Sequence, residues 1–324
     1  MAGVSQTTVS MVLNNRTDTE VRIAAETRER VLRVIRETGY VADPAARRLA
    51  ERRNRIIGVF TYEAVFPSAG ADFYHPFLLG IEERAEDAGC DLLLFTSAKA
   101  APGERRRIFN AESRVRLADG CLLLGRTVDR DDLARLLAEG IPFVSIGRRD
   151  DAGGPVPYVG VDYPAAARAL VERARALGHT RLAYAGCGDG GESRSDRMRG
   201  FRDAAGPEAL HLPVEATAHP RILDELTAAG VTAVFVEEPA DGTALAEAAA
   251  ARGLEVPGDL SILVLGTPDR QPGFSGFRIP RRETGRRAVE LLNDVLERGG
   301  TPQELLPCEP VEGTTLAAPR DRRA

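Results

Sequence analysis

The sequence lacks the marks of several protein classes. Its four cysteines (Cys90, Cys121, Cys187 and Cys308) stand far apart and form no C-x-x-C pair. That usage favours reduced thiols in a cytoplasm over a disulfide scaffold or a zinc site. No apolar run is long enough to span a bilayer, and residues 1–13 lack the basic start and long apolar core of a signal peptide. We therefore expect a cytoplasmic protein without a membrane partner.

Catalytic and metal-binding patterns are also missing. The histidines show neither H-x-x-x-H nor H-E-x-x-H spacing, and no serine lies within G-x-S-x-G. Residues 186–191 match G-x-G-x-x-G directly after an apolar run, which is the start of a nicotinamide-dependent oxidoreductase fingerprint. No second strand ends in an acid about twenty residues later, as that fingerprint requires. We expect no enzyme, no metal and no cofactor, with the oxidoreductase as an alternative.

Charge is distributed unevenly along the chain. Residues 1–55 contain eleven arginines and seven acidic residues, a net charge of +4, whereas the remainder has a net charge of −9. A basic head on an acidic body indicates that the head alone meets a polyanion. The alternative explanation of the charge is a solvated, highly charged helix.

The body alternates short apolar runs with amphipathic stretches. The expected strands are residues 56–62, 91–96, 120–124, 141–146, 181–185, 233–236 and 261–265. The expected helices are residues 76–88, 104–117, 131–139, 165–177, 197–205, 221–229 and 243–252. This alternation predicts an α/β fold with parallel sheets and right-handed crossovers. Because the elements are too many for one core, we expect two doubly wound lobes.

The head reads differently, as a small all-α module without strands. Residues 4–13 and 27–38 form the expected helices, and Ser5 is a natural N-cap for the first of them. A third short helix is expected at residues 44–50. Valines of the first helix pack inward, while short polar side chains face outward, as on a recognition helix that reads base edges and phosphates.

These head residues resemble a known family. Residues 2–14 are similar to the second helix of the helix-turn-helix in the lactose-repressor/galactose-repressor (LacI/GalR) family, and the likeness continues through residues 26–31 and 44–50. The resemblance implies a homodimer that binds near-palindromic double-stranded operator DNA. It makes residues 44–50 a hinge helix whose leucine wedges into the minor groove. The implied DNA-binding residues are Ser5, Gln6, Thr7, Thr8, Ser10, Met11, Asn14, Ala46 and Leu49.

The body resembles the same family at residues 119–124, 177–179, 197–201 and 256–261. The implied fold is that of periplasmic binding proteins, with a small-molecule effector cleft between two lobes. The head is then residues 1–54 and the effector-binding and dimerisation domain residues 55–324, with an N-lobe of about 55–160 and 281–308 and a C-lobe of about 161–280 and 309–318. The implied effector-binding residues are Tyr74, Phe77, Arg148, Ser193, Arg197, Glu237 and Thr267.

The sequence departs from the family pattern at informative places. The helix that precedes the recognition helix is absent before Met1, so we expect an incomplete head. Met11 stands where arginine is frequent, and Ala42-Asp43 replaces Pro-Asn before the hinge helix. Gly266-Thr267 replaces an acidic pair that accepts hydrogen bonds from sugar hydroxyls. We expect an effector that is a sugar or sugar derivative and that offers fewer hydroxyl donors or carries a negative charge. The family resemblance implies that the regulator is a repressor. The alternative is an effector-binding module that has lost DNA binding.

Overall fold

The computed structural model describes residues 2–13, 23–38, 54–63, 73–96, 106–109, 113–214, 218–267 and 273–320. The chain divides into two compact units, Met1–Asn54 and Arg55–Ala324. Within the described ranges, no helix combines the length and apolarity that crossing a membrane requires. All four cysteines are free thiols.

The first unit contains the two expected helices, α1 (Gln6–Leu13) and α2 (Ala25–Thr38). Ser5 caps α1, as predicted, because its hydroxyl accepts a hydrogen bond from the Thr8 backbone N–H at 3.2 Å. Val12 and Val31 are the buried residues of the two helices. The hinge-helix prediction at residues 44–50 lies outside the described residues.

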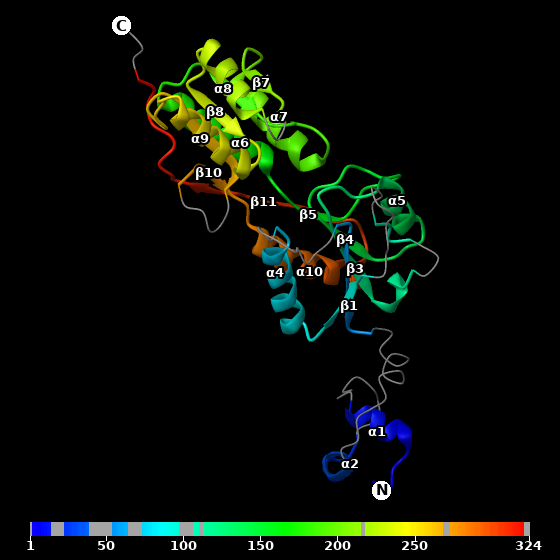
Figure 1. The fold of residues 1–324 in the computed structure, drawn as a ribbon. Coiled ribbons are helices and arrows are strands. Elements are labelled where there is room, and N and C mark those ends of the chain that lie inside the picture. The colour runs from blue at the N-terminus through cyan, green and yellow to red at the C-terminus, as the bar shows by residue number, and fades with distance from the viewer. Residues whose placement is uncertain are drawn as a thin grey trace. The chain divides into compact units, whose positions relative to one another are not determined.

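The second unit is built on two parallel-type sheets (Figure 1). In the first lobe, the strand order is β11-β5-β4-β3-β1-β2, and all pairs are parallel. Its strands are β1 (Ile56–Thr61), β2 (Asp91–Phe95), β3 (Gly120–Leu124), β4 (Phe143–Ile146), β5 (Tyr158–Val161) and β11 (Gln303–Leu306). Leu122 and Leu124 pack under α4 (His75–Asp87) and α10 (Arg281–Arg298), whereas Cys121 and Leu123 pack under α5 (Arg130–Ala138). The alternation places helices on both faces, as a doubly wound sheet requires.

The second lobe repeats this design with strand order β12-β10-β9-β8-β6-β7, in which β12 is antiparallel to β10. Its strands are β6 (Leu182–Ala185), β7 (Leu210–Leu212), β8 (Ala233–Val236), β9 (Ser261–Thr267), β10 (Ser275–Arg278) and β12 (Glu309–Val311). One face of the sheet packs on α6 (Tyr163–Ala176) and α7 (Glu192–Ala205), and the other on α8 (His219–Ala228) and α9 (Pro239–Ala251). The predicted α/β fold with two doubly wound lobes is confirmed.

The described chain passes between the lobes at three places: from β5 to α6, from β10 to α10, and from β11 to β12. Because β11 and β12 follow each other in sequence but lie in different sheets, the C-terminal segment ties the lobes together. The three crossovers carry Tyr163, Arg281 and Cys308, respectively.

One predicted helix is wrong. Of residues 104–117, the described residues 106–109 and 113–114 are not helical, and only Val115–Leu117 forms a single 3-10 turn, η1. The buried carboxylate of Asp132 accepts hydrogen bonds from the Ile108 N–H at 3.1 Å and from Arg107 Nε at 3.0 Å. The bond from the Ile108 N–H satisfies a backbone group that a helix would have paired internally. The sequence pattern also missed α10 and the strands β5, β7, β10, β11 and β12.

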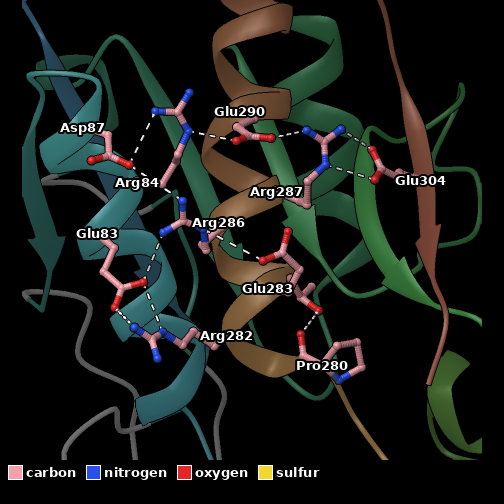
Figure 2. A network of polar contacts seen from close by, with 11 residues as sticks. Glu83, Arg84, Asp87, Pro280, Arg282, Glu283, Arg286, Arg287, Glu290 and Glu304 are labelled. Carbon is pink, nitrogen blue, oxygen red and sulfur yellow. Dashed lines mark hydrogen bonds and ion pairs between the residues drawn. The ribbon is translucent and has the colours of Figure 1, made fainter. Parts of the chain in front are cut away.

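The helices α4 and α10 lie side by side at unusually close range (Figures 1 and 2). A Cβ added at Gly80 would lie 1.9 Å from the Arg282 carbonyl oxygen, and one at Gly285 would lie 2.2 Å from the Phe77 carbonyl oxygen. Only glycine at both positions permits this backbone approach. The contact therefore fixes the positions of Phe77 and of the residue before Gly285, which is Thr284.

A network of ion pairs spans the solvent side of the same helices (Figure 2). Arg84 Nε donates to Glu290 Oε1 at 2.9 Å, and Arg287 Nη2 donates to Glu304 Oε2 of β11 at 2.6 Å. Glu83 of α4 accepts from two arginines of α10, Arg282 and Arg286. Individual exposed pairs contribute little, but a connected set holds α4, α10 and β11 in one register.

The stability of the body is expected to fall as the pH drops below about 6.5 because of His179. Its ring contacts the Thr232 hydroxyl at 2.9 Å and the Ala317 carbonyl at 2.8 Å, and burial lowers its pKa from the ordinary value of 6.5. The unfolded chain then binds a proton more readily than the native chain, so stability is complete above pH 6.5 and is lost as the pH falls toward the native pKa.

Urea unfolding at several pH values measures this effect. The slope attributable to His179 cannot exceed about 1.4 kcal/mol per pH unit, which corresponds to one proton. The variant His179→Gln should remove that part of the slope, whereas His75→Gln, at an exposed position, should keep it. An unchanged slope in His179→Gln would contradict the assignment.

Candidate functional site

A pocket lies between the two lobes, at the ends of their parallel strands. It encloses about 610 Å³, including its open mouth. The residues that line it follow strands or lie at crossovers: Phe73, Tyr74, Phe77, Leu124, Gly125, Arg126, Ile146, Gly147, Arg148, Arg149, Val161, Tyr163, Ser193, Asp196 and Thr284. Carboxyl ends of strands in α/β folds are where small ligands bind.

Arginines of the first lobe pair with carboxylates of the second lobe across this pocket. Arg148 Nε donates to Asp196 Oδ2 at 2.6 Å, and Arg149 Nη1 donates to Glu192 Oε2 at 3.1 Å. A third pair, Arg126 with Glu238, is longer, at 3.8 Å. We call these three contacts the interlobe ion pairs. All three run in the same direction, from a cation of the first lobe to an anion of the second, so they favour close approach of the lobes.

Burial differs along the interlobe ion pairs. The Asp196 side chain is 1% exposed and the Arg149 side chain 4%, whereas Arg126 is 53% exposed. Burial disfavours the charged form of Arg148, but hydrogen bonds to Asp196 and Asp150 outweigh it and raise its pKa. Burial lowers the pKa of Arg149, with Glu192 opposing the shift. The inner two pairs are therefore the ones with large energetic weight.

Arg197 differs from the arginines of the interlobe ion pairs. It is 8% exposed, its guanidinium lies 4.2 Å from the Tyr163 ring centroid, and its Nε has no hydrogen-bond partner among the described residues. The positive charge of Arg197 acts to lower the pKa of both Tyr163 and Cys308, so Arg197 lies where the interlobe crossovers come together. Burial raises the pKa of the Cys308 thiol to about 12, which makes this cysteine an inert neighbour.

The structure brings together part of the predicted effector set. Tyr74, Phe77, Arg148 and Ser193 line the pocket, and the Arg197 guanidinium lies 4.2 Å from the ring centroid of Tyr163, which lines it. Burial and a hydrogen bond to Glu63 raise the pKa of the Tyr74 hydroxyl, which therefore stays protonated and donates.

Three predicted effector residues, Arg197, Glu237 and Thr267, are not among those that line this pocket. Glu237 is 3% exposed, pairs with Arg194 Nε at 3.2 Å and accepts the Gly188 N–H at 3.1 Å. Thr267 is also 3% exposed, and its hydroxyl donates to the Phe277 carbonyl at 3.1 Å. Glu237 thus holds the glycine-rich segment after β6, and it occupies an N–H that a dinucleotide phosphate would need.

Several pocket residues escaped the sequence analysis: Phe73, Arg126, Arg149, Tyr163, Asp196 and Thr284. A signal existed for Arg126 and Arg149, since each follows a strand by two or three residues, as Arg148 does. Asp196 directly precedes Arg197, but an acidic residue in a helix gives no signal of its own, because acidic residues are common on helix surfaces. Tyr163 and Thr284 reach the pocket through crossovers, which no local pattern reveals. Among the described residues, no cluster of histidine, cysteine and acidic side chains could hold a metal ion.

The predicted DNA-binding residues of the head belong to or flank α1. Ser5 and Thr7 are exposed, and Thr8 and Met11 are half-buried. The Ser5 and Thr8 hydroxyls lie 2.9 Å apart and form a hydrogen bond. Gln6 and Ser10 lie within α1. Asn14, Ala46 and Leu49 lie outside the described residues.

Comparison with known proteins decides the family. Residues 1–43 match the family of bacterial regulatory proteins, lacI family, and residues 171–316 match the periplasmic binding protein-like domain. The chain is 31% identical over 317 residues to the HTH-type transcriptional regulator CelR of Thermobifida fusca, covering 91% of this chain and 89% of that relative. The chain belongs to the lacI family. It is a helix-turn-helix transcriptional regulator, as predicted, and not an enzyme.

Solved structures of lacI-family regulators share this fold. The lac repressor dimer bound to operator and the anti-inducer ONPF matches with a TM-score of 0.72 at 22% identity, covering 98% of this chain and 97% of that one. The CelR–cellobiose complex matches with a TM-score of 0.61 at 25% identity, covering 97% of both chains. The likeness to the lac repressor supports the fold of the body, including its two lobes.

Proposed function

We propose that this lacI-family regulator is a homodimeric repressor that binds a near-palindromic operator through its head and responds to a small polar effector in the interlobe pocket. The capped helix α1 presents Ser5 and Thr7 as exposed polar groups at its N-terminal end, where a recognition helix meets base edges. The relatives support both halves of the proposal, since one solved relative is bound to operator and another to cellobiose.

The effector half is carried by one observation. Residues from both lobes line one pocket, and the interlobe ion pairs adjoin it. A ligand there contacts Arg148 of one lobe and Ser193 of the other, so its binding free energy depends on how the lobes are arranged. Differential affinity of this kind is what lets a ligand shift a conformational equilibrium. A sugar or sugar derivative suits the mixed aromatic and polar lining.

The DNA half is tested by selecting binding sites from random duplexes with the intact chain. The enriched sequence should be near-palindromic, because a two-fold dimer presents two recognition helices. The Ser5→Ala variant should bind the selected site about fivefold more weakly at fixed salt, since the lost cap costs about 1 kcal/mol. Fluorescence anisotropy measures this affinity.

The control is Thr38→Ala, which also removes an exposed hydroxyl from the head but leaves the cap of α1 intact. Its affinity should equal that of wild type. Enrichment of an asymmetric site would contradict the dimer. Failure to enrich any sequence would favour the alternative of an effector-binding module without DNA binding.

A further inference from the structure

A buried positive charge without a protein counter-charge is the starting observation. Among the described residues, no carboxylate forms an ion pair with Arg197, and its Nε has no hydrogen-bond partner. Arg126, Arg148 and Arg149, which lie nearby, each have a carboxylate partner. A desolvated charge destabilises the folded state unless something pairs with it, and the contact with the Tyr163 ring compensates only in part.

The strand end nearest to Arg197 supplies no acidic side chain. A Cβ built at Gly266 would lie 3.7 Å from Arg197 Nη2, so an acidic residue at this place would reach the guanidinium. The neighbouring Thr267 turns its hydroxyl away, toward the Phe277 carbonyl. The end of β9 therefore leaves room beside Arg197 and offers no charged acceptor.

The described residues that line the pocket offer no unpaired carboxylate that would repel a negative charge. The lining includes Arg126, Arg148 and Arg149 but only one carboxylate, Asp196, which is engaged by Arg148 at 2.6 Å and Arg199 at 2.7 Å.

We infer that the pocket takes a small anionic metabolite, bearing a carboxylate or a phosphate, and that the anionic group binds Arg197 beside Tyr163. The inference rests on the proposed effector role of the pocket and assigns its ligand class. The guanidinium fork pairs well with either group. Since Tyr163, Arg281 and Cys308 of the three crossovers surround this place, the bound anion acts where the lobes are joined.

The first test needs no ligand. In the intact chain, Arg197→Met removes the uncompensated charge but keeps most of the side-chain volume. Its melting temperature without ligand should rise by about 2–4 °C, because an apolar side chain in place of an uncompensated buried charge stabilises the folded state. Arg202→Met, on the exposed side of the same helix, should leave the melting temperature unchanged. A structural arginine with an essential partner would give the opposite sign, and a lower melting temperature in Arg197→Met overturns the inference.

The second test uses neutral hexoses and pentoses, the matching sugar phosphates and the matching aldonates, by thermal shift and then calorimetry. Only anionic compounds should stabilise wild type, and the phosphate and aldonate arms identify which group is recognised. Arg197→Met should weaken the binding ten- to a hundredfold, Arg197→Lys should weaken it less, and Arg202→Met should not change it. A neutral sugar that binds wild type and Arg197→Met equally overturns the anion inference but leaves the effector role intact. If no anionic compound binds wild type, the anion inference is overturned, whatever the melting temperature of Arg197→Met.

Discussion

Asp196→Asn is expected to destabilise the body by about 3 kcal/mol, which lowers its melting temperature by about 6–12 °C. The Asp196 side chain is 1% exposed and joins Arg148 across the lobes as well as Arg199 in its own helix. Removing its charge leaves Arg148, which is 20% exposed, without its buried partner. An unpaired charge in a partly buried place costs more than the intact pair contributes.

A matched control isolates the effect of burial. Asp150 also accepts from Arg148 at 2.6 Å, but its side chain is 68% exposed, so Asp150→Asn should change stability by less than about 1 kcal/mol. Denaturant unfolding compares the two variants, and small-angle X-ray scattering should show a larger radius of gyration for Asp196→Asn, because an interlobe ion pair is lost. Equal destabilisation by the two variants would mean that the interlobe pair has no special weight.

The sequence predicted the α/β class and most elements of the body because apolar runs and amphipathic helices repeat there at regular spacing. The buried strands β3, β8 and β9 were predicted from their apolar residues alone, since both of their faces are covered. The crossover strand β11 was missed because half of its residues are exposed, and its place depends on pairing with β5, far away in the sequence. The segment before η1 was misread because the buried Asp132 organises it from a distance.

The site was predicted only where function follows from position in the fold. The family resemblance implied Arg148, after a strand, and Ser193, at the start of a helix, and both line the pocket. Glu237 meets the same positional rule, yet its carboxylate turns to Arg194 and Gly188. The order of strands predicts which residues lie near the cleft, but it does not predict which hydrogen-bond or ion-pair partner each side chain has. The interlobe ion pairs could not be predicted for the same reason.

Gly285→Ala is expected to destabilise the body by about 1–3 kcal/mol and to weaken ligand binding as well. The new Cβ would lie 2.2 Å from the Phe77 carbonyl oxygen and 3.1 Å from the Ile81 nitrogen. These are backbone atoms of α4, so the helices must move apart instead of a side chain turning away. Phe77 and Thr284 both line the pocket and flank the contact, so the displacement reaches the ligand site.

The control for this substitution is Gly242→Ala in α9. Its Cβ would lie 3.1 Å from the Val264 Cγ2 atom, which a small shift relieves, and at an ordinary contact distance of 3.6 Å from the Phe274 ring. Alanine favours a helix by about 1 kcal/mol over glycine, so Gly242→Ala should be neutral or stabilising. If both variants behave alike, close approach of α4 and α10 is not what glycine provides at residue 285.

The reciprocal glycine allows a sharper test of the same contact. Gly80→Ala alone should cost at least as much as Gly285→Ala, because its Cβ would lie 1.9 Å from the Arg282 carbonyl oxygen. The double variant should cost less than the sum of the two, since helices already forced apart by one methyl group have room for the other. A double-mutant cycle by urea unfolding measures this coupling. Additive costs would show that each glycine acts on its own helix, through local backbone conformation, and that the closeness of the helices does not position Phe77 and Thr284.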